Sequence, residues 1–185
     1  AAPPAFMGVK ARRSSSADKQ FLGDYLNTKS NVHLQKALQK TGDQQIIFAD
    51  TVIKVNKRTK MQERILLITE NHICNVDKNT NYKIKRKIQI KDVSSLVLST
   101  FADNFFLIKV PCEYDYFFVS AKKTEIVMRL LTAYQRITDT PLQVEFQNNF
   151  DYAAEIGLIR EVEFKSVAEG VTTHVTSKKS KTKAQ

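Results

Sequence analysis

Apolar residues near the N-terminus recur at helical spacing in two short segments. In "ADKQFLGDYLN", residues 17–27, the spacing predicts a short amphipathic helix, although Gly23 weakens it. In "NVHLQKALQKTG", residues 31–42, Asn31 can cap the start of a second helix and Gly42 can end it. The apolar positions are Phe21, Leu22, Tyr25 and Leu26 in the first segment and Leu34, Ala37 and Leu38 in the second.

From Gln45 onward the pattern changes to short β-rich runs. The runs are "IIFADTVIKVN", "RILLITENHICNV", "YKIKRKIQI", "SSLVLST", "NFFLIKV" and "YDYFFVS". The segments between them, "NKRTKM", "DKNTN" and "TFADN", favour turns. Consecutive β runs with short connections predict an antiparallel sheet that bends into a sandwich or barrel.

A longer helical pattern follows the strands, in "SAKKTEIVMRLLTAYQRITDTP". Ser120 or Thr124 can cap its start, and Pro141 prevents it from continuing much beyond Thr138. A single helix at this place would cover the open end of a small barrel. The segments "LQVEF" and "EIGLIREVEF" then predict one or two further strands. The sequence therefore predicts an α+β fold that is mainly β.

These patterns divide the chain into five stretches. We expect a flexible basic lead-in at 1–19, a helical extension at 20–42, the barrel core at 43–140, extra C-terminal strands at 141–166 and a basic disordered tail at 167–185. The first stretch is rich in small residues, proline and serine, and the last is polar and basic, which is typical of linkers and tails.

The composition excludes several classes of protein. The 185 residues are 42% apolar, which suits a globular domain, and runs such as "ILLI" are too short to span a bilayer. Two cysteines do not make a disulfide framework, and the three histidines lack the spacing of a zinc site. The chain has no Gly-rich phosphate loop, HExxH or GxSxG motif. We therefore expect no catalytic residue, no metal and no cofactor.

The net charge of +10 points instead to an anionic partner, either nucleic acid or an acidic membrane surface. In "IKVNKRTKMQERILLI", a hairpin with its turn centred on Thr59 would set Lys54 opposite Arg64 on one face. Opposed like charges are destabilising, and an anion between them would reverse the sign of that interaction. Three more cations would lie at the turn, namely Lys57, Arg58 and Lys60.

The run "YKIKRKIQIK" adds a second basic element. Its lysines alternate with apolar residues, so strand periodicity predicts that they lie on one face, away from the core. These lysines are Lys83, Lys85, Lys87 and Lys91. Arg86 falls on the apolar side, which indicates either an edge position or a buried ion pair. Four lysines on one strand face exceed what solubility needs and favour an anion-binding surface.

Several of these segments together resemble the lipid-binding tail homology region of class I myosins. The resemblance rests on "FLGDYLN", on "FADTVIKVNKR" followed by "RILLIT", and on "YKIKRKIQIKDVSSLVLST" and "DNFFLIKV", and it covers residues 21–164. It implies a pleckstrin-homology-like barrel closed by a helix. It also implies binding of anionic phospholipids and phosphoinositides, with Lys54 and Arg64 at the headgroup. Non-specific attraction would come from Lys57, Arg58, Lys60, Lys83, Lys85 and Lys87.

The resemblance further implies that the chain is part of a longer single-headed motor. This region would anchor the motor to membranes and would not be an enzyme itself. Actin and calmodulin-like light chains would bind the rest of the parent chain. The expected location is cytoplasmic, peripheral at the plasma membrane or endocytic membranes, and no nucleic acid is expected.

Two other functions fit parts of the sequence. A nucleic-acid-binding domain would use the charge, with Tyr82 and the aromatics of "YDYFF" stacking on bases. A peptide-binding or scaffolding module would use a sheet edge.

Terminal cations could assist membrane attraction, and phosphorylation of Ser14, Ser15 or Ser16 after the basic pair would weaken it. The terminal cations are Lys10, Arg12, Arg13, Lys178, Lys179, Lys181 and Lys183.

Overall fold

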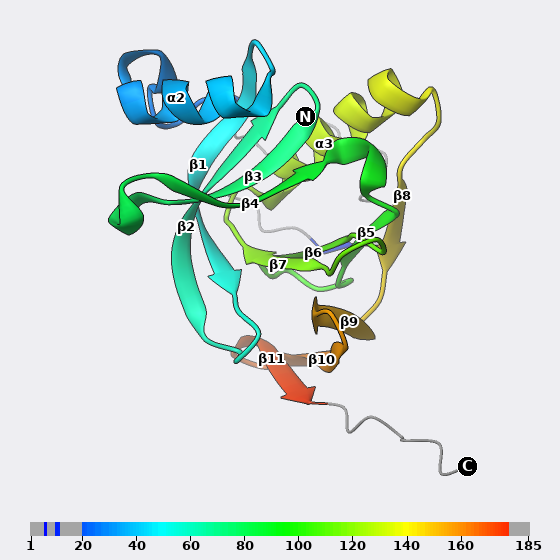
Figure 1. The fold of residues 1–185 in the computed structure, drawn as a ribbon. Helices are drawn as coiled ribbons and strands as arrows, with labels where there is room; N and C mark the ends of the chain where they lie inside the picture. The colour runs from blue at the N-terminus through cyan, green and yellow to red at the C-terminus, as the bar shows by residue number, and fades with distance from the viewer. Residues whose placement is uncertain (1–5, 7–9, 12–19, 178–185) are drawn as a thin grey trace, which may run out of the picture.

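The computed structural model describes residue 6, residues 10–11 and residues 20–177, and these form two sheets and several helices (Figure 1). The larger sheet consists of β1 (Ile46–Val55), β2 (Met61–Thr69), β3 (His72–Asp77), β4 (Lys83–Gln89), β5 (Ser95–Leu98), β6 (Phe105–Lys109), β7 (Tyr116–Val119) and β8 (Gln143–Phe146). The smaller sheet consists of β9 (Asn149–Glu155), β10 (Leu158–Val167) and β11 (Gly170–Ser177). The helices are η2 (Thr28–Ser30), α2 (Val32–Thr41), η3 (Lys78–Thr80), η4 (Ile90–Asp92) and α3 (Lys123–Thr138).

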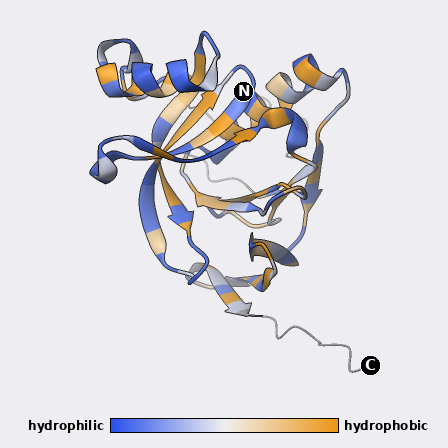
Figure 2. Cartoon of the chain, in the orientation of Figure 1, coloured by the Kyte–Doolittle hydropathy of each residue, from blue (hydrophilic) through white to orange (hydrophobic). Residues whose placement is uncertain are grey.

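The larger sheet bends around the main core, and α3 covers that core. Its strand order is β4-β3-β2-β1-β7-β6-β5-β8, and its pairs are antiparallel except for β5 with β8. Ile126 and Leu130 of α3 pack into the same cluster as Phe48, Leu66 and Phe118 of the strands. This arrangement of seven antiparallel strands followed by a helix is pleckstrin-homology-like, and it confirms the predicted α+β, mainly β fold. Figure 2 shows the hydrophobic residues along the central strands, whereas the β1–β2 loop is mostly hydrophilic.

The second helix of the N-terminal extension forms as predicted. In α2 the Asn31 side chain accepts hydrogen bonds from the backbone N–H groups of His33 and Leu34, and Gly42 ends the helix at φ +77°. Leu34 and Ala37 pack against the outer face of β2 and β3. α2 therefore covers the side of the sheet that faces away from α3.

The segment before α2 is not the helix that the apolar spacing predicts. Within residues 20–27 the chain forms bends and no helix, and Asp24 forms a parallel bridge with Ala49 of β1. Gly23 has φ +76°, and its N–H donates to the buried Glu125 carboxylate at 2.8 Å. A left-handed residue interrupts helical hydrogen bonding, and pairing with β1 satisfies the backbone in its place. The prediction of a first helix is therefore wrong for the described residues.

Gly23→Ala is expected to destabilise the protein more than Gly157→Ala. Both glycines have φ near +77°, so each substitution carries the cost of a left-handed alanine, about 1–2 kcal/mol. A Cβ on Gly23 would also lie 2.8 Å from the Ile47 carbonyl oxygen, whereas a Cβ on Gly157 meets nothing within 4 Å. Urea unfolding of the two variants measures the difference. Equal losses of unfolding free energy would contradict the close contact at Gly23.

The smaller sheet extends beyond the predicted C-terminal strands. Its order is β11-β10-β9, and its apolar side chains, including Phe150 and Phe164, pack against Val55 and Phe117 of the larger sheet. The sequence predicted one or two strands here and a disordered tail from residue 167. That boundary is wrong, because β11 occupies Gly170–Ser177 and pairs with β10 along its length. Residues 178–185 of the expected tail lie outside the described residues.

One predicted run also contains two strands. "RILLITENHICNV" divides into β2 and β3, which are joined at Glu70 and Asn71. The four consecutive polar residues 69–72 separate the two apolar runs and mark the turn in the sequence. The consequence is a hairpin that brings Asp77, at the end of β3, within 3.9 Å of the predicted cation Arg64 in β2.

Candidate anion-binding site

The β1–β2 hairpin carries the two residues predicted to hold a headgroup, but its register differs from the prediction. Lys54 pairs with Gln62, and Arg64 pairs with Val52. The prediction that Lys54 lies directly opposite Arg64 is therefore wrong, although the two residues share a sheet face as diagonal neighbours. The turn is centred on Arg58 because the Asn56 side chain accepts from the N–H groups of Arg58 and Lys60, each at 2.9 Å.

Lys54 lies half-buried at the mouth of the barrel. Among the described residues none forms a hydrogen bond or ion pair with its ammonium group. Burial lowers the pKa of Lys54, and the charges of Arg64 and Arg86 lower it further. A desolvated cation surrounded by like charges is destabilising when no anion is present, so this position is well suited to bind one.

An open pocket of about 400 Å³ lies in front of Lys54. It lies between the β1–β2 hairpin, the β6–β7 loop and the end of β9. Its lining residues are Lys54, Asn56, Lys57, Arg58, Gln62, Tyr114, Ala154 and Glu155. The pocket combines three cations with amide and hydroxyl groups, and these are the donors that a phosphate ester requires.

Arg64 lies behind this pocket and does not line it. Its guanidinium donates to the Glu63 carbonyl at 2.8 Å and to the Gln62 side chain at 3.2 Å, and it lies 3.9 Å from the Asp77 carboxylate. Its buried Nε has no hydrogen-bond partner among the described residues. Arg64 therefore orients Gln62 toward the pocket and adds positive potential behind Lys54.

The rim of the pocket is held by the smaller sheet, which the sequence did not connect with the hairpin. Lys57 Nζ lies 3.1 Å from the Glu155 carboxylate, and Arg160 Nε donates to the Lys57 carbonyl at 2.8 Å. Arg58 and Lys60 are exposed beside them, as predicted. No local signal could identify Glu155, because it lies 98 residues from Lys57 in the chain.

The lysines of β4 are exposed as predicted, but they do not share one face. Lys87 pairs with Cys74 and Lys83 pairs with Asp77, and these partners lie on opposite faces of β3. Lys85 is the extra residue of a β-bulge between the two pairs, so the alternation reverses there. The prediction of a single lysine face on this strand is therefore wrong, although Lys83, Lys85 and Lys87 all remain accessible to an anionic surface.

Arg86 lies on β4, an edge strand of the larger sheet, so the edge position that the sequence left open is confirmed. Its buried guanidinium pairs with the exposed Glu113 carboxylate, and the ion pair is therefore buried on one side only. Its Nε donates to the Glu113 carboxylate at 3.1 Å, and its guanidinium carbon lies 3.6 Å from the Tyr114 ring centre and 4.2 Å from that of Tyr116. Arg86 thus connects β4 with the β6–β7 loop that lines the pocket. Stacking on two rings fixes the charge close to Lys54.

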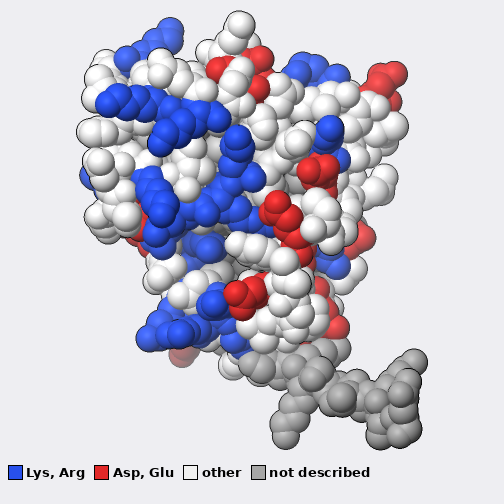
Figure 3. Space-filling view, viewed as in Figure 1, with Lys and Arg blue, Asp and Glu red and all other residues white. Residues whose placement is uncertain are grey.

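Basic side chains gather on one face of the molecule. Figure 3 shows Lys and Arg extending from α2 across β4 to the β1–β2 loop, with fewer acidic groups among them. Such a surface attracts an anionic partner of large area, and the pocket at Lys54 lies within it.

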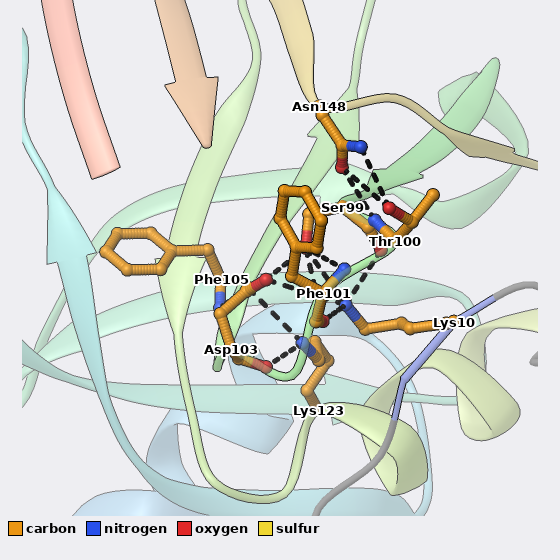
Figure 4. Close-up of polar contacts among 8 residues, drawn as sticks. All are labelled: Lys10, Ser99, Thr100, Phe101, Asp103, Phe105, Lys123 and Asn148. Atoms are coloured by element: carbon orange, nitrogen blue, oxygen red, sulfur yellow. Dashed lines mark hydrogen bonds and ion pairs between the residues drawn. The ribbon is translucent and has the colours of Figure 1, made fainter. Parts of the chain in front are cut away.

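Lys10 does not belong to this surface, which corrects its assignment to a terminal cluster that assists membrane attraction. Its ammonium is fully buried and donates to the carbonyls of Ser99 and Phe101 at 2.8 and 2.6 Å. Figure 4 shows Lys10 and Lys123 directed toward Asp103. Lys10 Nζ lies 3.6 Å from one oxygen of the Asp103 carboxylate, and Lys123 Nζ lies 3.5 Å from the other. The expectation of a flexible lead-in at residues 1–19 does not hold at Lys10. The other cations of the terminal clusters and Ser14, Ser15 and Ser16 lie outside the described residues.

Other kinds of site find no support within the described part of the chain. No group of three or more His, Cys, Asp or Glu side chains gathers there as a metal site. No helix among residues 20–177 is long and apolar enough to cross a membrane. The pocket at Lys54 is therefore the candidate site that the described residues favour.

Solved structures similar to the chain include pleckstrin homology domains. The solution structure of one such domain has a TM-score of 0.45 at 18% identity and covers 52% of this chain and 92% of that chain. The domain of human oxysterol binding protein-related protein 11 has a TM-score of 0.44 at 15% identity, with coverages of 52% and 86%. The fold assignment rests on the strand order and on α3.

Relatives in sequence are myosin heavy chains. Myosin IB heavy chain of Dictyostelium discoideum is 29% identical over 165 residues, which are 86% of this chain and 15% of that protein. Myosin heavy chain IB of Acanthamoeba castellanii is 31% identical over 185 residues, with coverages of 96% and 16%, so the chain spans a small part of both relatives. A family model described as "Unconventional myosin tail, actin- and lipid-binding" matches residues 12–184. The chain therefore belongs to the unconventional myosin tail family, as a tail region without a catalytic role and not as the motor head.

Proposed function

We propose that this tail binds anionic phospholipids, and phosphoinositides in particular, through the pocket at Lys54. The observation that carries the proposal is the half-buried Lys54 ammonium, which has no partner among the described residues and faces an open pocket with Lys57 and Arg58 at its rim. A headgroup phosphate there would pair with Lys54 and remove its repulsion with Arg64. The family description as lipid-binding supports the same class of ligand.

Headgroup selection and membrane attraction would come from different residues. Lys54, with Arg64 behind it, would favour polyphosphorylated inositides because a phosphate monoester carries more charge than a phosphodiester. The exposed cations would each contribute about 1 kcal/mol near an anionic leaflet, falling off within a Debye length. These cations are Lys57, Arg58, Lys60, Lys83, Lys85 and Lys87.

In the whole protein, we propose that this region links an actin-based motor to membranes. The relatives are myosin heavy chains, and the family description names actin and lipid as ligands of the tail. Membrane binding by this region would then place the motor at the cytoplasmic side of the plasma membrane or of endocytic membranes. Calmodulin-like light chains would bind outside the present chain.

Vesicle co-sedimentation tests the proposal. The protein is expected to bind phosphatidylcholine vesicles when they contain phosphatidylserine, and more tightly when they contain a phosphoinositide at equal total charge. Lys54→Ala with Arg64→Ala should abolish the preference for phosphoinositide. Lys91→Ala with Lys165→Ala removes the same charge outside the pocket and should keep it.

Two outcomes would count against the proposal. If the Lys54 and Arg64 double variant retains the preference, the site is wrong. If the protein ignores vesicles but shifts an RNA or DNA oligonucleotide at physiological salt, the basic face serves nucleic acid, since purely electrostatic binding fades steeply there.

A further inference from the structure

The turn between β9 and β10 presents a large apolar side chain directly to solvent. Ile156 is 77% exposed, more than any other large hydrophobic residue of the described chain, and it belongs to none of the hydrophobic clusters. Turn positions of this kind are dominated by Gly, Asn, Asp, Ser and Pro, and a β-branched apolar residue gains nothing there from the fold. The folded protein alone gives no reason for isoleucine at this position.

This turn is attached to the rim of the candidate anion-binding site. Glu155, the residue before Ile156, pairs with Lys57, and Arg160 of β10 donates to the Lys57 carbonyl. Gly157, at φ +77°, closes the turn directly after Ile156. The tip of the β9–β10 hairpin therefore lies beside the basic β1–β2 loop and is held there by two contacts.

A second exposed apolar residue lies on the basic hairpin itself. Met61 is the first residue of β2, follows Lys60 directly and is 61% exposed. It pairs with Val55, whose side chain packs against the smaller sheet, so Met61 lies on the sheet face that the smaller sheet covers. Apolar groups thus accompany cations on both hairpins that border the pocket.

We propose that the β9–β10 turn is a membrane-insertion element, in which Ile156 enters the interfacial layer of an anionic bilayer when the pocket at Lys54 engages a headgroup. The inference rests on the proposed function, because the basic rim is what would bring this turn to the membrane. Cations beside an apolar tip match the two layers of an anionic bilayer surface, with charged headgroups outside and acyl chains below. Ion pairing of Glu155 with Lys57 orients the tip without neutralising Arg58 or Lys60.

Insertion of Ile156 adds an apolar contribution to the free energy of membrane binding that salt does not screen. Raising the salt to roughly 0.5 M shortens the Debye length to about 4 Å and weakens the attraction of exposed lysines. Salt does not weaken the free energy gained by burying an isoleucine side chain in the bilayer. Partial burial of Ile156 should tighten vesicle binding by about fivefold to tenfold. The parent protein is therefore expected to retain binding at high salt that Ile156→Asn lacks.

The chain contains no tryptophan, so one introduced at the turn is a unique probe. Ile156→Trp should bind phosphatidylcholine–phosphatidylserine vesicles at least as tightly as the parent, because tryptophan favours the membrane interface. Its emission should shift to the blue on binding and be quenched by lipids with brominated acyl chains. The matched control is Leu22→Trp, also exposed at 65% but next to Gly23, which contacts Glu125 of α3. We expect no blue shift and no quenching there.

The outcomes separate this inference from the proposed function. If Ile156→Trp binds vesicles without a blue shift or quenching, or loses binding that the parent retains, insertion is wrong while lipid binding stands. If Ile156→Asn weakens co-sedimentation with actin filaments but not with vesicles, the turn contacts protein and the inference is also wrong. If the parent itself does not bind anionic vesicles, both proposals fail.

Discussion

Lys54→Met is expected to weaken binding to phosphoinositide vesicles by about tenfold to a hundredfold, the cost of losing hydrogen bonds between a phosphate and a charged donor. The same substitution is expected to raise the free energy of unfolding of the unliganded protein. Methionine retains the length and apolar stem of lysine but removes the charge. The two effects therefore have opposite signs and one cause.

The cause is the electrostatic environment of the empty pocket. Burial lowers the pKa of Lys54, and Arg64 and Arg86 add to the shift, so the folded state disfavours the charged ammonium. Below its lowered folded-state pKa Lys54 is charged in both the folded and the unfolded state, and the penalty is fully present. Removing the charge relieves this penalty, which for like charges on neighbouring strands is a few tenths to about 1 kcal/mol. A bound phosphate relieves the same penalty by neutralising it.

Lys57→Met is the control for this prediction. Lys57 lies on the same rim but is exposed and paired with Glu155, so it contributes to general attraction without being strained. Its loss should weaken vesicle binding by up to about fivefold and should not increase stability. Urea unfolding and vesicle titration of both variants give the comparison. A Lys54→Met protein that is less stable than the parent, or that binds phosphoinositide equally well, would overturn the assignment of Lys54.

The parts of the fold that the sequence predicted well are those that depend on local burial. The spacing of the apolar residues in α3 indicates one buried helix face. The caps Asn31 and Gly42 predict the ends of α2, because capping is a contact between residues close in sequence. Strand runs were found for the same reason. The segment around Gly23 failed because its helical spacing competes with pairing to β1, a partner that periodicity cannot reveal.

The errors in the site have non-local or side-chain causes. The Asn56 side chain fixes the turn and thereby moves Lys54 away from direct opposition with Arg64. A single bulged residue, Lys85, reverses the strand alternation in β4. Glu155 reaches the pocket from a different sheet. Charge and resemblance therefore identify the region of the site, whereas the register and the opposing sheet determine which cation faces the ligand.

Asp103→Asn is expected to destabilise the protein by about 3–5 kcal/mol at pH 6 or below, the usual cost of removing one partner from a buried ion pair. Asp103 is the carboxylate that both Lys10 and Lys123 approach, and all three side chains are almost fully buried. It also accepts hydrogen bonds from the Phe105 N–H at 2.9 Å and from the Ser99 hydroxyl. Asparagine keeps the shape and an acceptor oxygen but leaves two buried ammonium groups without a counter-charge.

The pH dependence of the free energy of unfolding distinguishes the loss of the Asp103 charge from a loss of packing. Burial lowers the pKa of Lys123 to about 7, with Asp103 opposing the shift and Lys10 adding to it. The ordinary value is 10.5, so between these values the unfolded state holds more protons and stability rises with pH. Without the carboxylate the lysines lose their protons at lower pH. The unfolded lysines titrate alike in both proteins, so the deficit of Asp103→Asn should be largest at acidic pH and shrink as the pH rises through the folded-state pKa of each lysine in the parent, which is about 7 for Lys123. A packing defect would not change with pH.

Lys123→Met supplies the matched control, because it removes a surplus cation and leaves Lys10 paired with Asp103. Replacing a buried charge that exceeds its counter-charge with an apolar side chain should change stability by no more than about 1 kcal/mol. Urea is the appropriate denaturant, since guanidinium would screen the effect. Hydrogen exchange at the Ala11 N–H, which donates to the Thr100 carbonyl at 2.8 Å, should accelerate in Asp103→Asn as Lys10 is released. An Asp103→Asn protein within 1 kcal/mol of the parent at pH 6, with the Ala11 amide still protected, would mean that Lys10 is held to the barrel by the Ser99 and Phe101 carbonyls alone.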